Sequence, residues 1–124
     1  MSDELRGVVL AHGSLAQALV AAAEEISGIR DALVPVSNAG CNRPVLEERL
    51  REALEGGPAL IFVDLPTGSC FVAALRAMGS VDRVRVVTGV NLTMLLDFLF
   101  HRSLPLDQAA ARAGAMGVQA IAER

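Results

Sequence analysis

The sequence predicts an α/β fold in which a mainly parallel sheet of about four strands has helices on both faces. Four short runs rich in aliphatic and β-branched residues alternate with segments whose apolar residues recur at helical spacing. Strands that alternate with helices in this way form parallel sheets covered on both sides. With 124 residues and no linker or internal repeat, the chain is expected to form a single-domain sandwich spanning 1–124.

The composition excludes several classes of protein. Hydrophobic residues make up 52% of the chain but aromatic residues only 3%, so the core must consist mainly of Ala, Val, Leu and Ile. A net charge of -3 argues against nucleic-acid binding, which requires a basic face. The N-terminus does not resemble a signal peptide, and no apolar run approaches the roughly 18 residues of a membrane span. We expect a cytoplasmic protein with reduced thiols.

The first strand and helix follow from two different patterns. The continuous apolar run Gly7–Ala11 predicts a strand that is buried on both faces. Leu15, Leu19 and Ile26 then recur at helical spacing, and Gly28 supplies the stop that commonly ends a helix.

The second strand is predicted at Ala32–Val36, and a polar, turn-rich loop follows it at 37–44. Leu46, Leu50 and Leu54 then lie on one face of an amphipathic helix with charged residues on its other face. A Gly-Gly-Pro stretch ends this helix.

The third strand is predicted at Ala59–Val63. The helix after it places Phe71, Leu75 and Met78 on one face, and the fourth strand is predicted at Val84–Thr88.

The segment Leu92–Phe100 predicts a helix that is apolar over most of its circumference, with only Asp97 on the wet side. Pro105 prevents this helix from continuing, so a separate final helix runs to about Ala122. A helix that is apolar nearly all round is normally buried on more than one face. We therefore expect a homodimer with this helix or its flanking strand at the interface.

The predicted topology brings two titratable side chains together. Open α/β sheets bind ligands beyond the carboxyl ends of strands, at the point where the winding reverses. In the strand order 2-1-3-4 that point lies between the first and third strands. His12 follows the first strand and Asp64 follows the third, so these residues should be neighbours although they are 52 positions apart (64 minus 12).

This pair has the chemistry of a phosphohistidine site. A neutral imidazole is a good nucleophile near pH 7, and a carboxylate such as Asp64 can fix its tautomer. Helix N-termini bind phosphate through free N–H groups. Gly13 opens the first helix, while Gly68 and Ser69 open the third, so these residues are candidates to hold a phosphoryl group on His12. No second base is evident to activate water, which disfavours a hydrolase.

Three stretches carry motifs of one known protein family. They are HGxxAxxL starting at His12, FVDLPTGSCFVAA at 62–74, and VTGVNLTMLLDFLFHR at 87–102. Together they resemble the mannose-family enzyme IIA components of the phosphoenolpyruvate-dependent sugar phosphotransferase system (PTS). The resemblance covers nearly the whole chain, and GVNxxML is its most specific part. It implies that 1–124 is a mannose-type IIA domain, that the protein is a phosphotransferase, and that it forms a homodimer.

The resemblance also implies roles for individual residues. The histidine matching His12 accepts a phosphoryl group from phospho-HPr and passes it to an enzyme IIB partner for sugar uptake or regulation. The acid matching Asp64 orients that histidine, and the serine matching Ser69 helps to hold the phosphoryl group. Contact with a membrane would be indirect, through a permease complex. The chain departs from the family pattern at Thr67, Cys70, Val72 and Thr93.

Other interpretations remain open at this stage. Asp64 can be a simple helix cap, and His101, beside Arg102 near a helix end, fits a structural role. Cys70 lies in the first turn of a helix, where the pKa of a thiol falls, so a Cys–His nucleophile is conceivable. A regulatory module that binds a partner according to the state of His12, with no sugar permease, would share the same site. We expect no cofactor and no metal, because the His and Cys residues would have to converge from separate loops.

Overall fold

The four strands form one parallel sheet in the order β2-β1-β3-β4, as the sequence predicts. The computed structural model describes residues 4–80 and 83–124. Its strands are β1 (Arg6–Ala11), β2 (Leu33–Ser37), β3 (Ala59–Val63) and β4 (Val84–Thr88). Each lies within one residue of its predicted position, because continuous aliphatic runs bounded by turns indicate buried strands.

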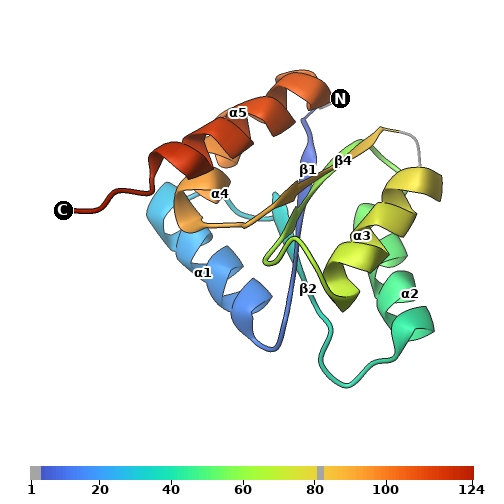
Figure 1. Ribbon diagram of the computed structural model, residues 1–124. Helices are drawn as coiled ribbons and strands as arrows, with labels where there is room; N and C mark the ends of the chain where they lie inside the picture. The colour runs from blue at the N-terminus through green and yellow to red at the C-terminus, as the bar shows by residue number, and fades with distance from the viewer. Residues whose placement is uncertain (1–3, 81–82) are drawn as a thin grey trace.

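Helices cover both faces of this sheet (Figure 1). They are α1 (Leu15–Ser27), α2 (Arg43–Leu54), α3 (Ser69–Ser80), α4 (Leu92–Leu99) and α5 (Leu106–Gln119). Helices α1, α4 and α5 lie on one face, and α2 and α3 lie on the other. None of the helices in the described ranges has both the length and the apolar character that crossing a membrane requires.

The central strand β1 packs against both helical layers. Val9 and Ala11 belong to the core beneath α1 and α4, whereas Val8 and Leu10 belong to the core beneath α2 and α3. Because alternate side chains of a strand point to opposite faces, a strand buried on both sides must be apolar throughout. This packing explains the uninterrupted apolar run that precedes His12.

Helix α4 crosses the sheet closely at Gly7. A Cβ atom at Gly7 would lie 2.7 Å from side-chain atoms of both Phe98 and Leu33. Phe98 also packs edge-on against Phe62 of β3, with ring centroids 5.2 Å apart. Gly7 therefore leaves the space in which Phe98 reaches Phe62.

The surface expected for a second copy is largely covered within one chain. Four apolar residues of α4 are buried beneath neighbouring elements: Met94, Leu95, Phe98 and Leu99. By contrast, Phe100, which follows α4, is 62% exposed. The placement of Asp97 on the wet side was wrong, because that residue is buried and paired with another helix. The homodimer stays a prediction, but most of α4 is occupied by its own chain.

Helix α3 faces the sheet with small residues rather than large ones. Leu75 and Met78 are each 40% exposed, whereas Cys70, Ala73 and Ala74 are buried. Both sets recur at helical spacing, so periodicity alone cannot distinguish the buried face. The small residues allow α3 to lie close to the sheet, which leaves the long side chains outside.

Candidate functional site

His12 and Asp64 meet at the carboxyl edge of the sheet. β1 pairs with β3 in a register that places Leu10 beside Val63, so the residues that follow the two strands are neighbours. The backbone N–H of His12 donates to Asp64 Oδ2 at 3.0 Å, and the imidazole Nδ1 lies 2.8 Å from the same oxygen. The structure thus places side by side the two residues that the topology argument paired.

The carboxylate of Asp64 is well supplied with donors. Its side chain is 10% exposed, and its other oxygen accepts the backbone N–H of Leu65 at 2.9 Å. Burial raises the pKa of Asp64, but the hydrogen bonds and favourable charge of His12 outweigh it, so the pKa lies below its ordinary value. An ionised Asp64 accepts the Nδ1 proton, which leaves the Nε2 lone pair of His12 free. The imidazole is 41% exposed and reachable from solvent.

The turn after His12 is held by the loop that follows β2. Gly13 adopts a φ of 60°, a conformation that favours glycine. Its N–H donates to Asn38 Oδ1 at 3.1 Å, and its carbonyl accepts from Ser37 Oγ at 2.6 Å. From the sequence, Ser37 and Asn38 were expected only to belong to a polar loop. The signal was available, because the carboxyl end of β2 lies at the same edge as that of β1.

Gly68 and Ser69 lie on the loop that continues from Asp64. Gly68 has a φ of 92°, and its carbonyl accepts from Val72 in the first turn of α3. Both residues line a hollow of about 170 Å³, whose lining includes neither His12 nor Asp64. The remaining lining residues of this hollow are Asn38, Cys41, Asn42, Arg43, Leu46, Val72 and Ala73. Gly68 and Ser69 therefore form one wall at the N-terminus of α3.

Cys70 contradicts the expectation of an activated thiol. Its side chain is fully buried, and burial together with the charge of Asp64 raises the pKa of the thiol to about 11. A lowered pKa, expected for a thiol at a helix N-terminus, is wrong for Cys70, because loss of solvent outweighs the helix dipole. Cys70 nevertheless lies near the pair: the ligand atoms of His12, Asp64 and Cys70 are all within 4.8 Å of one another.

His101 lies at the other end of the sheet. Its neighbour Arg102 exchanges hydrogen bonds with Leu5, just before β1, whereas His12 follows that strand. The imidazole Nδ1 of His101 is 2.7 Å from the backbone carbonyl oxygen of Asp97. This second histidine is thus separate from the edge that carries His12.

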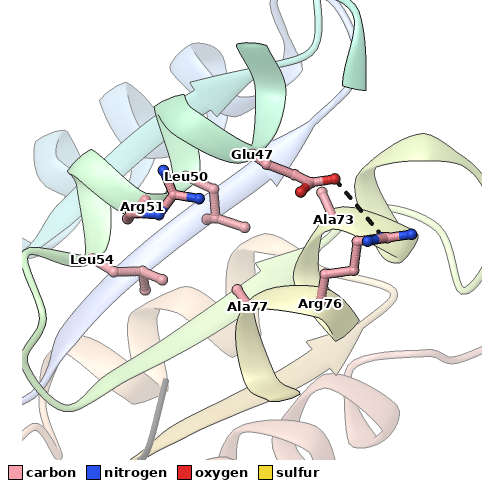
Figure 2. A pocket seen from close by; sticks show the side chains of 7 residues that line it. All are labelled: Glu47, Leu50, Arg51, Leu54, Ala73, Arg76 and Ala77. Carbon is pink, nitrogen blue, oxygen red and sulfur yellow. Dashed lines mark ion pairs between the residues drawn. The ribbon is translucent and has the colours of Figure 1, made fainter. Parts of the chain in front are cut away.

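A second hollow opens between α2 and α3. Figure 2 shows Glu47 and Arg76 facing each other across it, with Leu50 and Ala77 also lining it. Nε of Arg76 and Oε2 of Glu47 are 3.8 Å apart. Ala73 lines both this hollow and the one beside Ser69. Apart from this ion pair and Arg51, the side chains that line the hollow between α2 and α3 are apolar, so we assign this hollow no chemistry.

The family of the chain follows from its match to a family model. The model described as PTS system fructose IIA component (EIIA-man) matches residues 7–113, which include both His12 and Asp64. The chain belongs to this family. The resemblance drawn from the motifs is thereby confirmed.

Solved structures of similar shape include IIA proteins. The mannose/sorbose-specific IIA subunit from Enterococcus faecalis is 25% identical, with a TM-score of 0.87 over 98% of this chain and 95% of that one. Component EIIA from Streptococcus agalactiae is 19% identical, with a TM-score of 0.89 over 96% of each chain. The IIA protein associated with a fucose utilization operon in Streptococcus pneumoniae is 22% identical, with a TM-score of 0.74 over 99% of this chain and 96% of that one. The latter two likenesses concern the fold alone. A search of curated proteins found no match.

Proposed function

We propose that this IIA protein is a phosphocarrier, in which His12 accepts a phosphoryl group from phospho-HPr and passes it to an enzyme IIB partner. The observation that carries the proposal is the contact of 2.8 Å between His12 Nδ1 and Asp64 Oδ2. It fixes the tautomer in which Nε2 is unprotonated, and Nε2 belongs to a side chain that a partner protein can reach.

The transfer step needs only these two side chains. The Nε2 lone pair attacks phosphorus, a P–N bond forms, and the bond between phosphorus and its donor atom on HPr breaks. His12 then carries the phosphoryl group on Nε2 of a positively charged ring. The Nδ1–H of this ring still donates a hydrogen bond to Asp64 Oδ2. The ionised carboxylate stabilises that charge, as it does in other acid–histidine pairs. In onward transfer a nucleophilic atom of enzyme IIB attacks phosphorus, the P–N bond breaks, and its electron pair returns to Nε2 of His12.

The loops around the pair suit an anion. Gly13 precedes α1, while Gly68 and Ser69 open α3, so two helix N-termini are available near His12. Free N–H groups and the positive end of the helix dipole favour phosphate. We assign phosphoryl binding to Gly68 and Ser69 through the N-terminus of α3, and to Gly13 through the turn that leads into α1, because the N–H of Gly13 itself already donates to Asn38 Oδ1.

A thiol nucleophile has less support than His12. Cys70 is fully buried, and with a pKa of about 11 it is protonated at neutral pH. We expect Cys70→Ser to remain a phosphoryl acceptor. Loss of labelling in this variant, together with retention in His12→Ala, would favour the thiol.

The direct test is phosphorylation by purified components. The chain is incubated with enzyme I, HPr and phosphoenolpyruvate, and the modified residue is mapped by mass spectrometry. We expect an acid-labile, base-stable phosphoramidate on His12, no labelling of His12→Ala, and normal labelling of the control His101→Ala. Labelling that persists in His12→Ala, or that maps to His101, would overturn the assignment.

Two roles are possible for the chain once His12 is phosphorylated: transport and regulation. A transport component passes the phosphoryl group to enzyme IIB in the cytoplasm and meets the membrane only through a permease complex. A regulatory module binds a partner according to the state of His12 and has no such recipient. Measuring transfer from the phosphorylated chain to candidate IIB proteins distinguishes the transport component from the regulatory module.

If two copies assemble as proposed, light scattering should report twice the chain mass of 13.0 kDa.

A further inference from the structure

The proposed transfer uses His12 and Asp64 but leaves the neighbouring Cys70 unexplained. The three side chains come from separate segments: the end of β1, the end of β3 and the first turn of α3. Their ligand atoms nevertheless lie within 4.8 Å of one another. No metal was expected from the sequence because His and Cys residues would have to converge from separate loops, but the fold brings His12 and Cys70 together with Asp64.

We infer that His12 Nδ1, Asp64 and Cys70 bind a soft divalent cation, with Zn²⁺ as the best fit, and that the bound ion stops phosphoryl acceptance. Nitrogen, carboxylate oxygen and sulfur are the three donor types that Zn²⁺ takes in proteins. Mg²⁺ prefers oxygen alone and is not expected to compete. The effect on phosphoryl acceptance rests on the function proposed above, whereas binding of the ion does not.

The geometry requires small adjustments. With bond lengths of about 2.0–2.3 Å, tetrahedral coordination sets ligand atoms roughly 3.4–3.6 Å apart. The imidazole and carboxylate, now 2.8 Å apart, must separate slightly, and the thiol must approach. The ion then takes the place of the Nδ1 proton. A water molecule can complete the shell from the exposed side of the imidazole.

The charges and protons balance. Coordination displaces the thiol proton into solvent, which overcomes the burial that keeps Cys70 protonated. The thiolate and the Asp64 carboxylate together neutralise the two positive charges of the ion. The neutral imidazole keeps one proton, which moves from Nδ1 to Nε2 when the metal occupies Nδ1. A protonated Nε2 has no lone pair for phosphorus, so the zinc form cannot accept a phosphoryl group.

The test uses the full chain with cobalt and zinc as probes. Co²⁺ bound to a thiolate gives a sulfur-to-metal charge-transfer absorption, which we expect in the wild type and in the control Cys41→Ser. We expect no such band in Cys70→Ala. Competition against a chromophoric chelator should show one Zn²⁺ per chain, with affinity reduced about tenfold or more in Cys70→Ala and in His12→Ala. The His12 substitution guards against a packing defect at the buried cysteine, because its side chain is half-exposed.

Each result bears on the inference. A cobalt complex without the charge-transfer band, or zinc affinity equal in wild type and Cys70→Ala, would overturn the site. ¹⁵N NMR of the zinc form should move the proton of His12 to Nε2, and a proton retained on Nδ1 would overturn the mechanism of inhibition. Phosphorylation by phospho-HPr is measured separately with and without Zn²⁺. Absence of labelling in both conditions refutes the proposed function and leaves the zinc binding data standing.

Discussion

Two histidine–aspartate pairs occur among the residues that the structure describes, and they differ in what surrounds them. His12 and Asp64 come from different segments and meet 2.8 Å apart at the carboxyl edge of the sheet. His101 and Asp97 are one helical turn apart, and the nearest contact of His101 Nδ1, at 2.7 Å, is the backbone carbonyl. Exposure does not separate the two imidazoles, which are 41% and 36% exposed. Exposure of an imidazole near a carboxylate is therefore not enough to predict a reactive histidine.

The partner of each carboxylate makes the difference. Asp97 is 5% exposed and accepts from the guanidinium of Arg112 at 2.9 Å, so its charge is already balanced by a permanent cation. Asp64 takes its hydrogen bonds from His12 and Leu65, so its charge is available to a histidine that becomes positive. His101 also follows the C-terminal end of a helix, where exposed carbonyl groups repel an anion. The surroundings of His12 and Asp64 therefore favour phosphoryl transfer, whereas those of His101 and Asp97 favour a structural role.

Exchanging each carboxylate for an amide should give the largest difference. Asp64→Asn removes the charge that stabilises a positive ring, so we expect phosphoryl transfer to slow by about 10²- to 10⁴-fold with the fold intact. The matched variant Asp97→Asn should transfer at the wild-type rate. Rapid-quench measurement of transfer from phospho-HPr gives both values. Equal rates for wild type and Asp64→Asn would reduce Asp64 to a helix cap.

Removing the cation of the second pair should affect stability instead. Arg112→Ala leaves the buried Asp97 carboxylate short of a donor, and we expect the free energy of unfolding to fall by roughly 1–3 kcal/mol. Arg85→Ala breaks an exposed ion pair with Asp107 and should cost less than about 1 kcal/mol. Urea denaturation compares the two variants. A larger loss in Arg85→Ala would show that Asp97 does not depend on Arg112.

A smaller effect is expected from the loop that supports His12. Asn38→Ala removes the acceptor of the Gly13 N–H, and a hydrogen bond of about 1 kcal/mol corresponds to a slowing of transfer by about fivefold. Asn42→Ala is the control, because Asn42 caps α2 through Val45 and should lower stability without slowing transfer. If both variants slow transfer equally, Asn38 acts through general stability rather than by positioning.

The smallest expected effect is on the free energy of unfolding at acid pH. The folded-state pKa of Asp64 lies below its ordinary value of 3.8, so the ionised form stabilises the fold above that pH. This contribution is lost as the pH falls below 3.8 and through the folded-state pKa. Unfolding by urea at a series of acid pH values should therefore show a slightly steeper loss for the wild type than for Asp64→Asn. Parallel curves would mean that His12 does not stabilise the ionised carboxylate.

Much of the fold was predictable because burial leaves a direct trace in the sequence. Strands covered on both faces must be apolar throughout, so Gly7–Ala11 and Ala59–Val63 indicated the sheet, and the strand order then paired His12 with Asp64. Orientation within helices was harder to predict. Cys70 and Leu75 lie on stripes of equal periodicity in α3, and only packing against the sheet decides which is buried.

The pairing of His12 with Asp64 was predictable from the sequence, whereas the contacts that surround the two histidine–aspartate pairs were not. His12 and Asp64 end strands, where topology fixes position. The support from Asn38 depends on the path of an irregular loop, and the burial of Asp97 depends on Arg112 from a helix 15 positions away. These contacts arise from tertiary packing, for which the local sequence carries no periodic signal.

The strand order has a consequence for folding of the chain during its synthesis on the ribosome. β1 is synthesised first, yet it becomes an interior strand whose neighbours, β2 and β3, emerge later. All three strand pairings are parallel and join segments separated by a helix, and such long-range pairings form slowly. A nascent chain paused before β3 therefore leaves the apolar residues of β1 uncovered, which makes it a target for chaperones. His12 emerges early but acquires its carboxylate only when the second half of the sheet has been translated.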